Sequence, residues 1–242
     1  MSAASPGVEK KGSPNFHVAH HFDSADTQFD AGRMGIWLFL VTEILFFGGL
    51  FCAFFIFRSR YFDSFVEAHN HLDWRLGALN TVFLITSSLT MALGVRSAQV
   101  SDKGLTSKML LVTFLLAGAF LVVKYFEYTH KIHDGLLPGN LFFPGEALTD
   151  PAAEHARRLE ILHSKGFTSH HPHVFFSIYF VMTGIHGLHV VIGMGLILWI
   201  LFRNMRGEFS GRYYAAVEGT GLYWHLVDLI WIYLFPLLYL VG

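Results

Sequence analysis

The sequence predicts an all-α membrane protein, a polytopic transmembrane bundle of five spanning helices with a cytoplasmic N-terminus. Composition is the first indication, since 53% of the 242 residues are apolar and only 14% are charged, whereas an ordinary soluble domain is about 25% charged. Patterning is the second, because the apolar residues form continuous runs and do not alternate. Continuous runs favour helices over a β-barrel, since a spanning helix satisfies its own backbone hydrogen bonds.

The apolar runs are each long enough to cross a bilayer, which requires about 20 mostly apolar residues in a helix. The predicted helices cover residues 34–57, 77–98, 108–129, 173–202 and 217–241. Together they make one transmembrane domain, 33–242. The preceding stretch, 1–32, carries scattered Gly, Ser, Pro and Asp, and we expect it to be a polar surface or partly disordered extension.

The basic residues of the short loops orient the bundle, because cytoplasmic loops carry an excess of Lys and Arg. With the N-terminus inside, the inner helix ends carry Arg33, Arg96, Lys103, Lys108, Arg203, Arg206 and Arg212. The outer ends carry Arg58, Arg60, Arg75 and Lys131. This bias favours a cytoplasmic N-terminus and puts the longest loop, 130–172, outside. Within that loop, Asp150 followed by Pro151 predicts a short surface helix that reaches about His163.

The charge balance and the cysteine content each exclude a class of protein. A formal charge of -1 and a pI of about 6.9 provide no basic excess to attract a phosphate backbone, so we expect no binding to nucleic acid. The single cysteine, Cys52, cannot form an internal disulfide. Its place in an apolar run favours plain packing.

Ionisable side chains within the predicted helices are the candidate functional groups, because inserting an acid there costs at least ~2.5–3.5 kcal/mol. At a rise of about 1.5 Å per residue, Glu43 lies about 14 Å from the inner start of its helix, and His225 and Asp228 lie about 12 and 17 Å into the last helix. His186 and His189 share one face of the fourth helix and reach the same layer. We therefore expect the first, fourth and fifth helices to meet there, with these side chains as mutual hydrogen-bonding partners.

Four acids or bases within these helices need an interpretation. Glu43 is either a proton-relay or ligand carboxylate, or a neutral or histidine-paired acid that fixes helix packing, and we favour the second. Lys124 and Glu127 lie toward the outer end of the third helix, where long side chains reach the membrane interface. Glu218 begins the fifth helix, where the helix dipole favours a carboxylate, and it shares a face with His225.

A series of motifs follows the predicted helices in order. They are Arg33-Met34-Gly35, Glu43-Ile44-Leu45-Phe46-Phe47, Gly184-Ile185-His186-Gly187-Leu188-His189-Val190, and Glu218 with Tyr223-Trp224-His225-Leu226-Val227-Asp228 and Trp231. In this order, on these helices, the set resembles subunit III of the haem–copper cytochrome c oxidases. Leu79-Asn80-Thr81 and Glu127 look like the family as well. The resemblance covers the chain from about residue 33 to the C-terminus, apart from the long outer loop.

The resemblance implies a subunit of an oxidoreductase and proton-translocating complex that itself carries no catalytic residue, metal ligand, haem or copper. Haems and copper would lie in partner subunits. The chain would pack against the catalytic subunit I, bind phospholipids between its helices and support proton uptake in aerobic respiration. The implied partners are subunits I and II, with subunit IV or a respiratory supercomplex as further candidates, in the cytoplasmic membrane of a bacterium.

The resemblance also assigns residues. Glu43 matches the family's membrane-embedded glutamate. The expected lipid-binding or interhelical polar network further includes Glu127, His186, His189, Glu218, His225 and Asp228. The chain departs from the common seven-helix form, because the polar extension replaces the first two helices, although five-helix versions occur. The outer loop is longer than usual and suggests an extra contact with a neighbouring subunit or an electron donor.

Two alternative functions stay open at the level of the sequence. An accessory subunit of nitric oxide reductase shares the five-helix fold and many of these motifs. A membrane di-metal oxygenase is suggested by histidine groups on the outer side, since histidine clusters bind metals. These groups are His69 with His71, His130 with His133, and His170 with His171 and His173. Such sites need several ligands at fixed helical spacing with carboxylates, and two of these groups fall in loops without an acid at matching spacing, so we expect solvated loop histidines.

Overall fold

The computed structural model describes residues 24–137, 157, 160–164, 166–168, 171–209 and 214–240. Its elements are the helices α1 (Ala25–Arg60), α2 (Phe62–His69), α3 (Trp74–Gln99), α4 (Lys103–His133), α6 (Pro172–Met205) and α7 (Ala215–Tyr239). Five of them, all but the short α2, are long and apolar enough to cross a membrane. The predicted all-α class and the five spanning helices are therefore confirmed within the described residues.

The helices begin and end somewhat differently from the predicted spans. Helix α1 begins at Ala25 and not at Met34, because the Ser24 hydroxyl accepts a hydrogen bond from the backbone N–H of Thr27 at 3.1 Å and caps the helix. Residues 25–32 of the predicted extension are thus helical. The surface helix predicted after Pro151 lies mostly outside the described residues.

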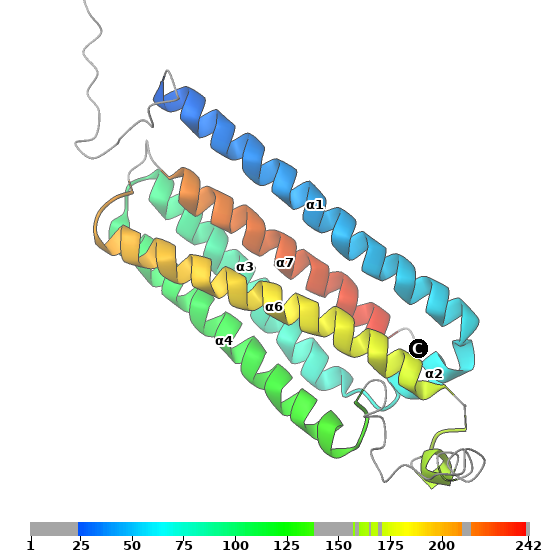
Figure 1. Ribbon diagram of the computed structural model, residues 1–242. Helices are drawn as coiled ribbons and strands as arrows, with labels where there is room; N and C mark the ends of the chain where they lie inside the picture. Colours follow the sequence, from blue (N-terminus) through cyan, green and yellow to red (C-terminus); the bar gives the residue numbers. More distant parts are fainter. Residues whose placement is uncertain are drawn as a thin grey trace, which may run out of the picture.

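Helices α3, α4, α6 and α7 form a four-helix bundle, and α1 lies at its edge (Figure 1). Helices α3 and α4 make an antiparallel hairpin, while α7 packs against both α3 and α6. Helix α1 contacts α7 more extensively than it contacts α6. The first, fourth and fifth spanning helices do meet, as predicted, but the interior of the bundle is shared with α3 and α4.

One end of the bundle carries the short helix α2, and we refer to it as the α2 end (Figure 1). The last turns of α4 and α7 and the first turns of α3 and α6 lie there. The described part of the long loop packs onto the same end. Thr168 donates to the Glu67 carboxylate through its backbone N–H and its hydroxyl, and Phe167 stacks on His71 with ring centroids 4.3 Å apart.

Two glycines bring the helices into close contact. A Cβ added at Gly193 of α6 would lie 2.7 Å from the indole of Trp224, which is fully buried. One added at Gly221 of α7 would lie 2.8 Å from the side chain of Val95 on α3. Both contacts are shorter than carbon atoms tolerate, so α7 can lie this close to α3 and α6 only because these positions have no side chain.

Candidate functional site

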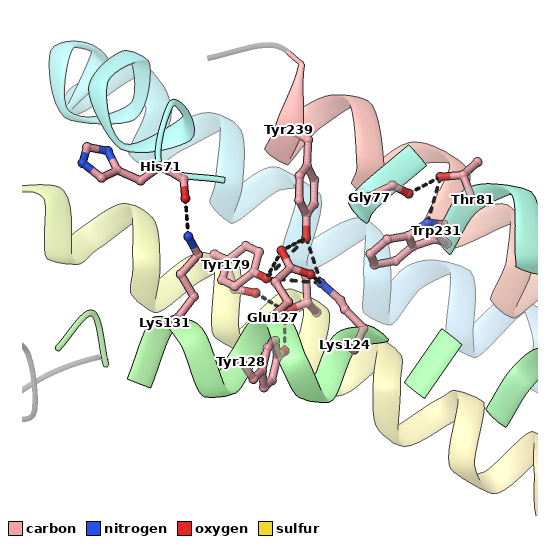
Figure 2. A network of polar contacts seen from close by, with 11 residues as sticks. His71, Gly77, Thr81, Lys124, Glu127, Tyr128, Lys131, Tyr179, Trp231 and Tyr239 are labelled. Atoms are coloured by element: carbon pink, nitrogen blue, oxygen red, sulfur yellow. Dashed lines mark hydrogen bonds and ion pairs between the residues drawn. The ribbon is translucent and has the colours of Figure 1, made fainter. Parts of the chain in front are cut away.

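The α2 end holds a buried cluster of charged and phenolic side chains from three helices (Figure 2). The Lys124 ammonium donates to Glu127 Oε2 at 2.9 Å, to the Tyr239 hydroxyl at 2.8 Å and to the Tyr179 hydroxyl at 3.2 Å. Both tyrosine hydroxyls in turn donate to Glu127 Oε1, at 2.9 Å from Tyr179 and 2.5 Å from Tyr239. The cluster therefore joins α4, α6 and α7 through one ion pair.

Aromatic rings surround this ion pair. The Lys124 ammonium lies 4.9 Å from the ring centroid of Trp231 and 5.1 Å from that of Tyr179, within reach of cation–π attraction. The Tyr128 hydroxyl lies 2.5 Å from Thr183 Oγ1 and ties α4 to α6 beside the cluster. One turn further along α4, the buried Lys131 ammonium donates to the backbone carbonyl of His71.

The expectation that Lys124 and Glu127 reach the membrane interface is wrong. Lys124 is 7% exposed and Glu127 3%. Both continue the buried stripe of α4 that runs from Thr106 through Ala117 and Phe120, so the rotation of α4 points them into the bundle. Residues of this stripe recur every three or four positions in the sequence. That spacing could have predicted that Lys124 and Glu127 face the interior.

Glu43 of α1 and His189 of α6 form the predicted contact in the middle of the bundle. Glu43 Oε2 lies 2.9 Å from His189 Nε2. His189 Nδ1 lies 2.8 Å from the carbonyl oxygen of Ile185, which can only accept, so Nδ1 carries a hydrogen. The Nε2 atom then either accepts a hydrogen bond from a neutral carboxyl or, in the imidazolium form, donates one to a carboxylate. In both states the pair has no net charge, which explains how an acid is tolerated at this depth.

His186 does not join this pair. Its ring lies against Phe120 of α4 and Trp231 of α7, with centroids 5.6 Å and 5.2 Å away. Neither ring nitrogen has a hydrogen-bond partner among the described residues. Two residues three positions apart on a helix differ by about 60° in direction, so His189 faces α1 while His186 faces the interior of the bundle.

His225 and Asp228 are also not partners of each other. His225 Nδ1 lies 2.6 Å from the Ser88 hydroxyl of α3, a residue that the sequence interpretation did not single out. Ser88 also lies close to Asp228, but neither carboxylate oxygen meets a described donor in hydrogen-bonding geometry. His225 thus ties α7 to α3, and not to α1 and α6 as predicted.

Glu218 lies in the first turn of α7, where the dipole favours a carboxylate. The side chain is half-buried, and its Oε2 atom has no hydrogen-bond partner among the described residues. The N-cap residue Tyr214 makes no side-chain cap hydrogen bond, and the charge of Glu218 favours this end of α7. Other polar links between helices come from residues without charge, such as Trp231 Nε1, which donates to Thr81 at 3.1 Å.

The fold and these contacts define a class of protein: a polytopic helical membrane protein with the acid–base pairs Lys124–Glu127 on α4 and Glu43–His189 between α1 and α6. Among the residues that the structure describes, no three His, Cys, Asp or Glu side chains gather in a way that could hold a metal ion. The polar contacts described above join neighbouring helices. This class alone does not distinguish a transporter from a subunit of a larger complex.

Comparison with known proteins identifies the family. A family model described as "Cytochrome c oxidase subunit III" matches residues 159–242. A relative from Synechocystis, "Cytochrome c oxidase subunit 3", is 33% identical over 88% of this chain and 76% of its own length. The chain therefore belongs to the subunit III family of the haem–copper oxidases, and the resemblance inferred from its motifs is confirmed. His186, His189, Glu218, His225 and Asp228 all lie in the region that the family model matches.

Two further relatives show the range of this family. A "Quinol oxidase subunit 3" from Bacillus spizizenii is 26% identical over 93% of this chain and 97% of its own length. A "Heme-copper oxidase subunit I+III" from Aeropyrum pernix is 27% identical over 88% of this chain and 23% of its own length. Proteins of this family are subunits of an oxidoreductase complex, so this chain has other oxidase subunits as partners.

Proposed function

We propose that this chain is a non-catalytic, lipid-binding subunit of a proton-pumping haem–copper terminal oxidase. It stabilises the catalytic subunit I and supports proton uptake, while haems and copper lie in subunits I and II. Membership of the subunit III family supports this role. The relative from Aeropyrum pernix supports the partner in particular, because its printed name joins subunits I and III. The membrane is the bacterial cytoplasmic membrane, with the N-terminus on the cytoplasmic side.

The observation that carries lipid binding is an apolar groove between α1 and α6 near the α2 end. Its volume is about 350 Å³, within the range of small-molecule sites. It is lined by Leu50, Ala53, Phe57, His173, Val174, Ser177, Ile178, Val181 and Met182. Both helices are apolar enough to span a membrane, so the groove opens to the hydrocarbon layer, where an acyl chain is the available occupant.

The rim of the groove suits a phospholipid head group. His173 lines the groove in the first turn of α6, and Arg58 and Arg60 lie in the last turn of α1 at the same end. The guanidinium groups of Arg58 and Arg60 carry the positive charge that recognises a lipid phosphate. A phospholipid held here would fill the space between α1 and α6, where the two helices make few direct contacts.

Replacing Ala53 by Trp tests the lipid site. The indole would fill the groove, so the purified oxidase complex should retain fewer phospholipids in native mass spectrometry than the unsubstituted complex. Cys52→Trp is the matched control, because Cys52 is the neighbouring residue of α1, is exposed and does not line the groove. Equal lipid retention in the two variants would exclude this groove as the site.

Deleting the chain tests its role in the complex. The oxidase should keep nearly normal haem and copper spectra but lose activity faster during turnover, because subunit I lacks its stabilising neighbour. Returning the intact chain should restore the longer lifetime. A deletion that removes haem or copper from the complex would contradict a non-catalytic role. This outcome is independent of the Ala53 experiment, which concerns the lipid alone.

A further inference from the structure

Three polar side chains inside the four-helix bundle lack hydrogen-bond partners within the part of the chain that the structure describes. They are Asn80 of α3, His186 of α6 and Asp228 of α7, and their exposed fractions are 0%, 0% and 2%. Every side-chain nitrogen and oxygen of the three is buried without a hydrogen-bond partner among the described residues. More than about 90% of buried polar groups in proteins do have a partner, so three such residues in one bundle need an explanation.

Trp231 places the three residues in one region. Its ring lies 5.2 Å from that of His186, and its Nε1 atom donates to Thr81, which directly follows Asn80. Asp228 precedes Trp231 by three positions, so the two residues are only about 4.5 Å apart along the axis of α7. The contacts of Trp231 with α3 and α6 therefore set Asn80 and His186 at one level of the bundle, with Asp228 one turn away.

The chemistry of the three side chains selects the ligand. The Asn80 amide has donors and an acceptor, the His186 imidazole has one of each when neutral, and the Asp228 carboxyl has oxygens that accept. Water matches all of these, since a buried water makes about three hydrogen bonds and can both donate and accept. A metal ion is disfavoured, because no suitable group of three ligands occurs among the described residues. The nearest ammonium, that of Lys124, is already bonded to Glu127 and two tyrosines.

We propose that Asn80, His186 and Asp228 hold ordered water molecules around Trp231, in the interior of the bundle. The waters bridge α3, α6 and α7 in the middle layer, where no described side chain satisfies these groups. Trp231 contacts both Lys124 and His186. The waters therefore extend the Lys124–Glu127 cluster from the α2 end toward the interior of the bundle. The waters are bound by side chains of this chain alone, so their presence does not depend on which oxidase contains it.

Water-edited solid-state NMR of the native complex in lipid, with ¹⁵N-labelled His and Trp, tests the proposal without a substitution. Magnetisation from water should reach the His186 imidazole several-fold faster than the Trp224 indole. Trp224 is the comparator because it is also fully buried but has a protein partner, Ser87, at 3.0 Å. Equal transfer rates at the two sites would overturn the proposal.

A high-resolution electron density map of the same complex provides a second test. Water density should lie within hydrogen-bonding distance of the His186 nitrogens, and His186→Phe should remove it. Thr90→Val is the control, because the Thr90 hydroxyl is already paired with Thr113 at 2.8 Å, and this variant should leave the density in place. If the map resolves waters elsewhere in the protein but shows no water density beside the His186 nitrogens, the proposed site is refuted.

Discussion

The charges of Lys124 and Glu127 are tolerated in the interior of the bundle because each group is held by several partners. Lys124 illustrates this at the scale of one residue: its ammonium has three hydrogen-bond acceptors and lies over the ring of Trp231. Glu127 is satisfied from the other side by two tyrosine hydroxyls. Neither residue could remain charged in the bundle alone, because an unpaired buried charge costs several kcal/mol, of order 3–5, when its partner is removed.

The Lys124–Glu127 pair should therefore respond non-additively to substitution. Lys124→Met and Glu127→Gln alone should each lower the free energy of unfolding by about 3–5 kcal/mol, since each leaves a buried group unpaired. The double variant should lose much less than the sum. Unfolding in detergent, analysed as a double-mutant cycle, measures the coupling. Additive losses would show that the two residues act separately.

Glu43 should tolerate an amide but not the loss of its hydrogen bond. In Glu43→Gln the amide N–H₂ can still donate to His189 Nε2, so we expect nearly unchanged stability. Glu43→Ala leaves that nitrogen without a partner and should cost about 1–3 kcal/mol. Thermal unfolding of the purified protein distinguishes the variants. Thr42→Val is the control, because Thr42 bonds only to its own helix, at Phe39. Equal effects of Gln and Ala would contradict the hydrogen-bond account.

At the scale of the helices, rotation about the helix axis decides which groups meet. His186 and His189 are close in sequence, yet one faces Phe120 and Trp231 and the other faces Glu43. The rotation of α6 is set by packing, above all by the contact of Gly193 with Trp224. That contact also places the Trp224 indole N–H against Ser87 of α3, so a single glycine positions three helices.

Adding one methyl group at Gly193 should show that the packing of α6 against α7 depends on this glycine. In Gly193→Ala the new Cβ would lie 2.7 Å from the Trp224 ring, and the forced shift should destabilise the bundle by about 1–3 kcal/mol. Gly187→Ala, on the same helix, meets nothing within 4 Å and should be neutral. Thermal unfolding of the two variants, with tryptophan fluorescence as the probe, makes the comparison. A neutral Gly193→Ala would show that α6 and α7 can move apart freely.

At the scale of the whole molecule, the five spanning helices and the family follow from local features of the chain. Hydropathy predicts the spans because each helix must satisfy its own backbone hydrogen bonds in lipid, whatever its neighbours are. The motifs around Glu43, His186 and Asp228 indicate the family because they occur in order on the right helices. The pair between Glu43 and His189 could also be predicted, since depth along each helix brings them to one layer.

The partners of the other buried groups could be assigned only from the tertiary structure. Lys124 was expected at the interface but faces Glu127 and two tyrosines, and His225 contacts Ser88 in place of Asp228. Depth in the membrane depends only on position along a helix, so the sequence by itself determined it. The direction in which a side chain points depends on how its helix is rotated against its neighbours. Close contacts such as Gly193 with Trp224 set that rotation, and they exist only once the bundle has assembled.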